Sequence, residues 1–351
     1  MGSKLTTHYL GMDLSSPVIV GSCPLTMEPE TVRQLVVAGA GAIVLPSMLQ
    51  EQITYAVMKS EDPLGAIERS GYQPQQDKYN RGTEEYLKTI RKFKDTFPIP
   101  IIASINGASM GAWLDYAKEI QSSGADALEL NWQTAVAGPT ESSANVESRL
   151  CDCVSVLNTL VTIPIAVKLS QRFTNLASVV VQLRDAGAKG LVLFSHSPQW
   201  DVDIDRRHWT LRWGLSPTDS VGTILEGLVR ARAGVVDMSI AASGGIRTGE
   251  DAIKTMIAGA DVVMLTSEIY RQGPDAIRDV VAGLSQFLNS SRYDSLQAFQ
   301  AAIATDGSRY PHDQHLMRME LLDPLTRSKL YYDPTPVATH GSGDSFGHRM
   351  E

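Results

Sequence analysis

One local pattern recurs four times in the 351-residue chain and constrains its fold more than any other feature. In each copy a helix-like segment ends in a small residue and a glycine, a short turn follows, and an apolar run begins. Glycine suits the position just past a helix, and a short buried apolar run is typical of a strand in a parallel sheet. The copies are residues 38–45, 123–130, 186–193 and 258–265. Together they predict a parallel sheet covered by helices.

The remaining apolar runs bring the number of predicted strands to eight. We predict strands at residues 18–21, 42–45, 101–105, 127–131, 165–169, 191–194, 238–242 and 262–265. We predict helices over residues 29–38, 83–96, 112–123, 144–160, 176–186, 220–233, 249–258 and 275–288. Eight alternations that close on themselves give an α/β protein with a (β/α)8 TIM barrel. A doubly wound open sheet is the alternative, but no GxGxxG follows the first strand, which counts against its dinucleotide-binding form.

Several segments lie outside this alternation. Residues 5–14 alternate around Gly11 and predict an N-terminal hairpin that plugs the barrel floor. Long polar loops follow the second and sixth strands, at residues 48–82 and 195–219, and loops of that length are usually lids or binding segments. After about residue 304 the pattern fades. We therefore predict one barrel domain over residues 1–304, and an irregular C-terminal tail over 305–351 that is partly disordered or packed on a neighbour.

Composition excludes several classes of protein. The formal net charge is −8 and no long basic run occurs, so we predict no nucleic-acid partner. Cys23, Cys151 and Cys153 lack the spacing of a metal site or disulfide framework, and we predict no bound metal. We interpret Cys23 as a small buried residue. No apolar run approaches membrane-spanning length and no signal peptide is visible, so we predict no membrane partner and a cytoplasmic location.

The last two predicted strands each end in a loop of small residues that leads into a helix. Ser243, Gly244 and Gly245 follow one strand, and Thr266 and Ser267 follow the other. Glycines let the backbone approach a ligand closely, and unpaired N–H groups at a helix start favour an anion. Barrel enzymes commonly bind a phosphate on these two loops. The segment predicts a phosphate-bearing cofactor or substrate, with two ordinary turns as the alternative.

Polar residues end the other strands as well, where barrel enzymes carry their working groups. Lys168 ends one strand, and a buried cation there needs an anionic or electron-rich partner. It is a Schiff-base nucleophile, a cation facing an electron-rich ring, or a side chain that reaches out to solvent. Asn131 ends the preceding strand and can both donate and accept, as an amide or imide edge requires. By strand alternation we place Glu129 on the other side of that strand, as a structural residue.

His196 follows the sixth strand, between Ser195 and Ser197. Imidazole is the most natural proton acceptor at neutral pH among the strand-end residues. His196 is therefore a candidate base in a remodelled site. The alternative is a loop histidine bonded to a main-chain carbonyl.

The order and spacing of several segments resemble the dihydroorotate dehydrogenase family. The matching segments are residues 5–22, 103–107 with Trp113, 124–131, 164–169, 243–252, 258–267 with Tyr270, 273–274 and 293–299. They span almost the whole barrel but not the tail. The resemblance implies a (β/α)8 barrel that binds FMN at its C-terminal face. It also implies abstraction of a proton from one substrate carbon, with hydride transfer from the neighbouring carbon to flavin N5.

The resemblance carries roles over to individual residues. It implies that FMN is bound by Ser22, Ser47, Asn131, Lys168, Ser195, Gly244, Gly245, Thr266 and Ser267. Within this set Lys168 would lie near the N1–O2 edge of the flavin, and the last four residues would cradle the phosphate. Asn131 and Ser197 would contact the substrate. Thr134, Lys168 and His196 are the predicted catalytic residues.

The substrate side departs from the family pattern. The family usually carries a lysine after the second strand, where this chain has Pro46, and an Asn-rich segment in the loop where this chain has residues 71–76. Thr134 stands where the family has a cysteine or serine base, and a hydroxyl is a weak base without an activating partner. Ser195, His196 and Ser197 replace the usual Asn-Thr or Asn-Ser pair. The flavin cradle is largely kept, while the orotate cradle is largely rebuilt.

Three functions follow from these observations. The first is an FMN-dependent oxidoreductase acting on CH–CH groups, which converts dihydroorotate to orotate in pyrimidine biosynthesis or acts on a related small molecule. The second is a barrel lyase or aldolase that uses Lys168 as a Schiff base on a phosphorylated substrate. The third is a non-catalytic flavin-binding protein. The absence of an iron–sulfur cysteine motif leaves room for a separate electron-acceptor protein, and we expect a homo-oligomer.

Overall fold

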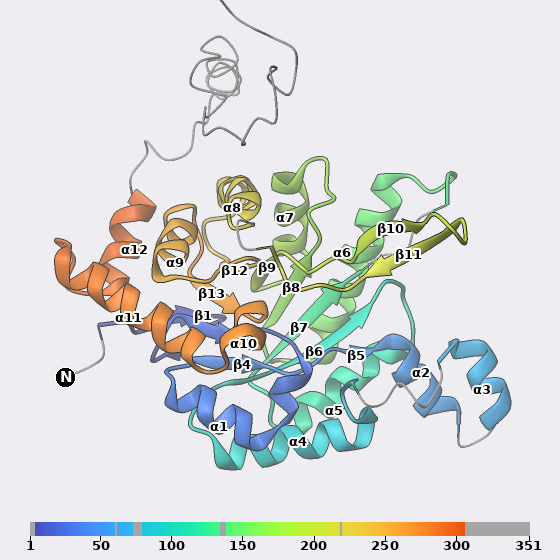
Figure 1. The fold of residues 1–351 in the computed structure, drawn as a ribbon. Helices are drawn as coiled ribbons and strands as arrows, with labels where there is room; N and C mark the ends of the chain where they lie inside the picture. The colour runs from blue at the N-terminus through green and yellow to red at the C-terminus, as the bar shows by residue number, and fades with distance from the viewer. Residues whose placement is uncertain (1–3, 60–61, 73–78, 134–137, 218–219, 306–351) are drawn as a thin grey trace, which may run out of the picture. The chain divides into compact units, whose positions relative to one another are not determined.

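The computed structural model describes residues 4–59, 62–72, 79–133, 138–217 and 220–305. Eight parallel strands form a closed barrel, with helices around it (Figure 1). The strands are β3 (Val18–Val20), β4 (Ala42–Val44), β6 (Ile101–Gly107), β7 (Ala127–Trp132), β8 (Ile165–Leu169), β9 (Gly190–Leu193), β12 (Ser239–Ser243) and β13 (Val262–Leu265). Each pairs with the next, and β13 closes the ring by pairing in parallel with β3. The predicted (β/α)8 TIM barrel is confirmed.

A helix follows each barrel strand and packs an apolar stripe against the outside of the barrel. These helices are α1 (Pro29–Val37), α4 (Gly82–Thr96), α5 (Tyr116–Ser122), α6 (Ser143–Leu160), α7 (Leu176–Asp185), α8 (Gly222–Gly234), α9 (Gly249–Ile257) and α11 (Asp275–Ser290). The predicted helix over 112–123 is divided into a 3-10 turn, η3 (Ala112–Asp115), and α5. Two further short helices, η1 (Pro24–Met27) and α10 (Ser267–Gln272), follow β3 and β13, and α12 (Leu296–Thr305) follows α11.

The barrel interior is filled mainly by alanine, valine and isoleucine side chains and is closed at its N-terminal end by a hairpin. Strands β1 (Thr7–Tyr9) and β2 (Met12–Leu14) pair antiparallel, and Tyr9, Leu10 and Leu14 pack against the inward-facing residues of the barrel. The N–H of Leu10 donates to Ser239 Oγ at 2.9 Å. Ser239 is the first residue of its strand, so the hairpin lies at the N-terminal end of the barrel, as predicted. The opposite end is left for a ligand.

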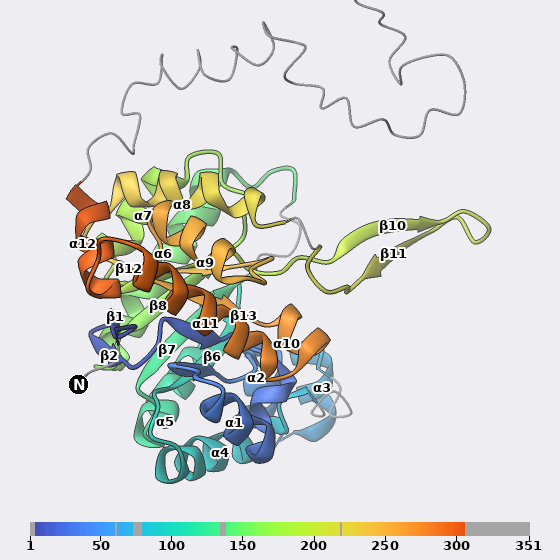
Figure 2. The same ribbon diagram turned by 60° about the vertical axis from the view of Figure 1, so that its left-hand side comes forward.

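Both predicted long loops contain secondary structure. The segment after β4 forms a short strand, β5 (Met48–Leu49), and two helices, α2 (Gln50–Met58) and α3 (Pro63–Ser70). The segment after β9 forms an antiparallel ribbon of β10 (Gln199–Asp203) and β11 (His208–Arg212). Figure 2 shows this ribbon extending away from the barrel. These elements were not among the strands and helices predicted from the sequence, and the assignment of the two segments as lids or binding segments stays a prediction.

Residues Met1–Asp306 form one compact unit. The predicted C-terminal tail lies outside the described residues from 306 onward, so its irregularity and its packing stay predictions. Across the described residues, no helix combines the length and apolarity needed to cross a membrane.

Candidate active site

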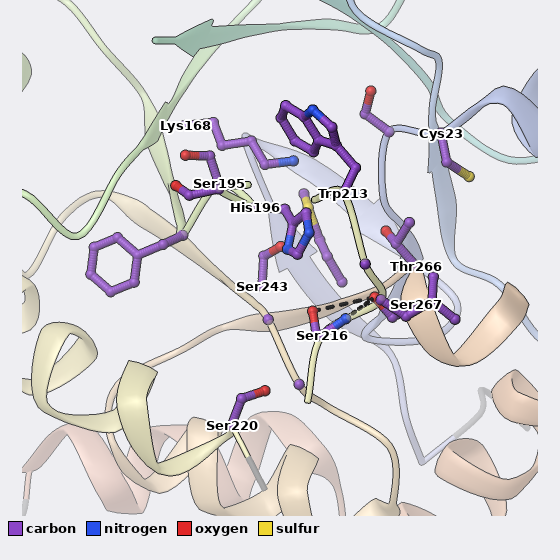
Figure 3. Close-up of a pocket in the computed structure, with 18 of the residues that line it drawn as sticks. Cys23, Lys168, Ser195, His196, Trp213, Ser216, Ser220, Ser243, Thr266 and Ser267 are labelled. Carbon is purple, nitrogen blue, oxygen red and sulfur yellow. Dashed lines mark hydrogen bonds between the residues drawn. The ribbon is translucent and has the colours of Figure 1, made fainter. Parts of the chain in front are cut away.

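A cavity of about 900 Å³ opens at the C-terminal ends of the barrel strands. Figure 3 shows Lys168, Ser195 and His196 extending into this space together with residues of the last two barrel loops. The predicted site residues that line it are Ser22, Ser47, Asn131, Lys168, Ser195, His196, Ser197, Gly244, Gly245, Thr266 and Ser267. The fold thus brings together every predicted site residue except Thr134, which lies outside the described residues. Their individual roles stay predictions.

One end of the cavity is bordered by main chain that side chains cannot cover. Gly244 and Gly245 have φ values of +123° and +71°, in a region that favours glycine. A Cβ atom on Gly245 would lie 2.0 Å from Ser220 Oγ, and one on Gly21 would lie 2.4 Å from Thr266 Oγ1. Gly245 and Gly21 therefore pack closely against neighbouring protein atoms, and Gly244 and Gly245 line the cavity.

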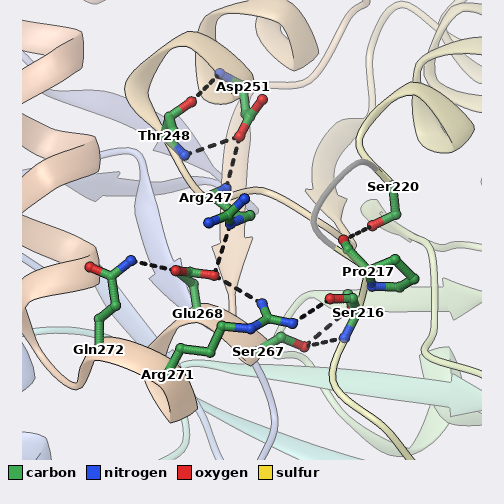
Figure 4. A network of polar contacts seen from close by, with 10 residues as sticks. All are labelled: Ser216, Pro217, Ser220, Arg247, Thr248, Asp251, Ser267, Glu268, Arg271 and Gln272. Carbon is green, nitrogen blue, oxygen red and sulfur yellow. Dashed lines mark hydrogen bonds and ion pairs between the residues drawn. The ribbon is translucent and has the colours of Figure 1, made fainter. Parts of the chain in front are cut away.

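Two guanidinium groups share one buried carboxylate at this end (Figure 4). Glu268 is 2% exposed, and its Oε2 atom accepts from Arg247 Nε at 3.2 Å and from Arg271 Nη1 at 2.9 Å. Burial alone raises the pKa of Glu268, but the hydrogen bonds from Arg271 and Gln272 and the charge of Arg247 bring it below its ordinary value. Among the residues that line the cavity at this end, two cations against one anion leave a net positive charge beside the glycine turn, which suits a phosphate.

The same network ties the loop after β9 to helix α10. Arg271 Nη2 donates to the carbonyl of Ser216 at 2.6 Å, and the N–H of Ser216 donates to Ser267 Oγ at 3.0 Å. At the start of α9, Thr248 and Asp251 form a capping box, with both bonds 3.1 Å long. The amides at this helix start are therefore engaged by the helix's own side chains. The anion-binding features at this end are the glycine turn and the arginines.

A chain of hydrogen bonds crosses the other end of the cavity beneath Lys168. Asn131 Nδ2 donates to Ser47 Oγ at 3.4 Å, and Ser47 Oγ lies 2.8 Å from Ser104 Oγ. Ser104 Oγ donates to Glu129 Oε1 at 3.2 Å. A hydroxyl has one hydrogen to donate, so the donors run in one direction, from Asn131 towards Glu129.

Glu129 is a correction to the sequence prediction. Residues two apart on a strand share a face, so Glu129 points into the barrel with Asn131 and not away from it. Its side chain is fully buried, and Oε1 lies 3.5 Å from Nζ of Lys168, which is itself only 8% exposed. Lys168 therefore has a protein anion as its partner and does not reach out to solvent.

Six buried side-chain polar atoms have no hydrogen-bond partner within the described part of the chain, and three of them belong to residues at or beneath the cavity. These three are Glu129 Oε2, Asn131 Oδ1 and Ser195 Oγ. Because the amide nitrogen of Asn131 is used on Ser47, its carbonyl oxygen is the side-chain atom left without a partner. Buried polar groups are normally paired, so Asn131 and Ser195, which line the cavity, indicate a polar ligand there.

His196 stands at the cavity wall with its ring 5.9 Å from the ring of Trp213. Within the described residues His196 forms no hydrogen bond with a main-chain carbonyl. The alternative role, a loop histidine bonded to such a carbonyl, therefore has no support among these residues. Cys23 is buried, and burial raises its pKa to about 11, which fits a small core residue and not a nucleophile.

Sequence reasoning missed several residues of the cavity. The charged residues at the end of the cavity beside the glycine turn were not predicted; they are Arg247, Glu268 and Arg271. Two further residues of the cavity lining were also missed, Gln171 and Arg172. The last two follow the end of β8 by only a few residues, so the rule that working groups follow barrel strands was the signal that pointed to them.

Comparison with known proteins places this geometry in a family. The dihydroorotate dehydrogenase family profile matches residues 4–288, which include every residue that lines the cavity. The chain belongs to the dihydroorotate dehydrogenase family. It is 26% identical over 298 residues to the catalytic subunit of dihydroorotate dehydrogenase B (NAD(+)) of Pyrococcus abyssi, covering 84% of this chain and 97% of the relative.

Other members of the dihydroorotate dehydrogenase family match to a similar degree. A putative dihydroorotate dehydrogenase A (fumarate) of Aeropyrum pernix is 28% identical over 268 residues, covering 75% of this chain and 85% of the relative. The dihydroorotate dehydrogenase B (NAD(+)) catalytic subunit of Methanocaldococcus jannaschii is 26% identical over 273 residues, covering 76% and 87%. The family resemblance read from the sequence is confirmed.

Proposed function

We propose that the chain is an FMN-dependent oxidoreductase that acts on CH–CH groups of a small molecule, either dihydroorotate, as in pyrimidine biosynthesis, or a related compound. One observation carries the proposal. A single cavity has a glycine turn with excess cationic charge at one end, and a buried lysine with unpartnered polar atoms at the other. A ligand in which a phosphate is joined to a polar ring system would be complementary to this distribution of protein groups.

The residues present fit FMN. Gly244, Gly245, Thr266 and Ser267 would hold the phosphate, because they line the cavity together with Arg247 and Arg271. Ser22, Ser47, Asn131, Lys168 and Ser195 would hold the ring. The free carbonyl of Asn131 accepts from an N–H donor, and Ser195 Oγ is available as donor or acceptor. When bound, FMN supplies the acceptor for a hydride from the substrate.

The protein's own groups would position the substrate and move one proton. His196 at the cavity wall is the proposed proton acceptor. Thr134 is the other candidate base, and it lies outside the described residues. Asn131 and Ser197 are proposed substrate contacts. Arg172 is the one cation among the described cavity-lining residues that forms no ion pair, so we assign it to an anionic group of the substrate.

The alternatives receive less support. A Schiff-base lyase needs a free neutral amine, whereas Nζ of Lys168 faces the buried carboxylate of Glu129 at 3.5 Å. No observation specifically favours a non-catalytic flavin carrier. Two of the three relatives described above are named catalytic subunits, which supports a separate electron-acceptor protein for this chain.

The deciding experiment is the visible absorption spectrum of the purified protein before and after anaerobic addition of dihydroorotate. A flavin band that bleaches is the expected result. A flavin band that persists would keep the FMN site and exclude dihydroorotate as the substrate. No flavin band, even after incubation with FMN, would refute the proposal. Borohydride trapping of a substrate on a colourless protein would then establish the lyase.

A further inference from the structure

Three neighbouring barrel strands each place a polar residue at the same level of the cavity. In the sheet register Asn106 of β6 pairs with Asn131 of β7, and Asn131 pairs with Lys168 of β8. All three residues line the cavity. Asn106 lies two residues beyond Ser104, whose hydroxyl donates to Glu129 inside the barrel, so Asn106 shares that inward face. We call Asn106, Asn131 and Lys168 the polar row.

Asn106 is the member of the polar row to which the resemblance and the proposed function give no role. Its side chain is half-buried, and a carboxamide offers both a donor and an acceptor. Among the described residues its carboxamide forms no hydrogen bond with another side chain or with the main chain. A polar group that the protein leaves unpaired at a cavity wall is available to a ligand.

The polar row alternates in what it offers to that ligand. Lys168 Nζ carries three hydrogens, and its partner beneath the cavity is Glu129 Oε1 at 3.5 Å, so hydrogens remain for the cavity. Asn131 uses its amide nitrogen on Ser47 and leaves Oδ1 as an acceptor. Asn106 supplies a second NH₂ group. The order along the row is therefore donor, acceptor, donor.

We infer that the polar row binds the imide edge of the flavin ring, with Asn106 donating a hydrogen bond to one of its two carbonyl oxygens. An imide presents a carbonyl oxygen, an N–H and a second carbonyl oxygen in that order, which is the complement of the row. The isoalloxazine ring of a flavin ends in such a group. The inference rests on the proposed function, because it takes FMN as the ligand, and it adds Asn106 to the residues that hold the ring.

The spacing of the polar row suits a single planar group. Neighbouring strands lie about 4.8 Å apart, so the backbones of Asn106 and Lys168 are separated by about 10 Å. Interior side chains of a barrel point towards a common axis, which brings their polar ends closer together than their backbones. Asn131 is held from beneath by Ser47, and Lys168 by Glu129. A site whose groups are fixed before binding loses less entropy when the ligand arrives.

The test is a thermodynamic cycle between Asn106 and the imide N–H, measured as flavin affinity on the full-length chain freed of flavin. The probes are FMN and 3-methyl-FMN, because the methyl group replaces the imide hydrogen and both flavins keep the phosphate. Flavin fluorescence during titration with protein gives the Kd of each. The unsubstituted chain is expected to bind 3-methyl-FMN at least about tenfold more weakly than FMN, since Asn131 Oδ1 is then left without a donor.

Asn106→Leu removes the proposed donor without changing the charge. It is expected to raise the Kd of FMN about tenfold, as the loss of one hydrogen bond does. The Kd of 3-methyl-FMN should change by less than about twofold, because the methyl group already holds the imide edge away from the row. A substitution that merely disturbed the fold would weaken both flavins alike.

Two further variants complete the cycle. Asn106→Asp keeps the shape of the side chain and sets an acceptor against the carbonyl oxygen, so it should weaken FMN at least as much as Asn106→Leu. It replaces Asn106→Leu in the cycle if that variant does not fold, which thermal unfolding of the flavin-free proteins shows. Asn158→Leu removes a carboxamide from the exposed face of α6 and is the control. It should bind both flavins as the unsubstituted chain does.

Each other outcome overturns the inference. Equal binding of FMN and 3-methyl-FMN by the unsubstituted chain would place the imide edge away from the polar row. Equal weakening of both flavins by Asn106→Leu would mean that Asn106 only shapes the cavity. An unchanged FMN affinity would remove Asn106 from the flavin site, and weaker orotate binding by that FMN-loaded variant would then assign it to the substrate. These results leave the proposed function standing, whereas an unsubstituted chain that binds no FMN would refute both.

Discussion

Lys168 and Glu129 form an ion pair in which neither side chain has more than slight access to water. Taking two opposite charges out of water is costly, and removing one partner leaves the other charge buried and unpaired. Ser104 and Ser47 extend the pair by hydrogen bonds to Asn131 at the cavity. Lys168 is thus in contact with polar residues beneath it, while it also lines the cavity above.

A double-mutant cycle on this pair should show strong coupling. Lys168→Met is expected to lower the free energy of unfolding by about 3 kcal/mol, because the buried Glu129 carboxylate loses its counter-charge. Adding Glu129→Gln should restore about 1–2 kcal/mol of that loss, since the uncompensated charge is then gone. Urea unfolding of the four proteins at equal FMN content measures the cycle. Additive losses would mean that the two groups do not stabilise each other.

Individual residues show which parts of the site could be predicted from the sequence and which could not. The strand-end rule located Lys168, Asn131 and His196, since it depends only on where apolar runs stop. Glu129 was assigned to the wrong face, although the period of two along a strand places it with Asn131. The pairing of Lys168 with Glu129 could not be predicted from either of these two residues alone. It depends on the register of β7 against β8, in which Asn131 pairs with Lys168.

At the scale of elements, Glu268 joins helix α10 to two arginines and, through Arg271, to the loop after β9. Because its pKa is lowered in the folded chain, the unfolded chain takes up a proton first as the pH falls. The stabilisation by Glu268 is therefore fully present above its ordinary pKa of 4.5 and is lost as the pH falls through the lowered value.

Glu268→Gln is expected to lower the free energy of unfolding by about 1–3 kcal/mol at neutral pH, because it removes the buried negative charge that two guanidinium groups share. The difference from the unsubstituted chain should narrow once the pH falls below 4.5. Glu250→Gln is the control, since Glu250 is an exposed partner of Lys254. Its effect should stay within about 0.5 kcal/mol. Urea unfolding at several pH values decides, and a pH-independent deficit for Glu268→Gln would contradict the argument.

The barrel elements were predictable and the inserted ones were not. Each barrel strand is a short apolar run bounded by glycine or polar residues. This pattern is local, so it predicts a strand without information about which segments pack against it. The segment after β4 instead depends on long-range contacts. Gln52 Nε2 donates to Asn80 Oδ1 at 2.8 Å, and Asn80 Nδ2 donates to the carbonyl of Ser47 at 3.0 Å. Polar contacts between residues this far apart leave no periodic trace in the sequence.

At the scale of the whole molecule, the barrel brings residues from strands far apart in the chain into one cavity. One end has the glycine turn and two arginines, and the other has Lys168 and Asn131. If both ends bind one FMN, the two halves of the ligand should contribute separately to stability. FMN should raise the unfolding midpoint, since a ligand at a hundredfold excess over its Kd stabilises by about 2.7 kcal/mol. Riboflavin, which lacks the phosphate, should stabilise less at the same concentration.

Gly245→Ala should remove the advantage of FMN over riboflavin, because its φ of +71° and a Cβ 2.0 Å from Ser220 Oγ would force the glycine turn to shift. Gly11→Ala is the matched control, since Gly11 has a similar φ of +75°, its Cβ would meet nothing within 4 Å, and it lies at the opposite end of the barrel. It should keep the advantage intact. Thermal unfolding of the three proteins with each flavin makes the comparison. Equal stabilisation of the unsubstituted chain by FMN and riboflavin would show that the phosphate contributes nothing. An advantage retained in Gly245→Ala would place the phosphate away from the glycine turn.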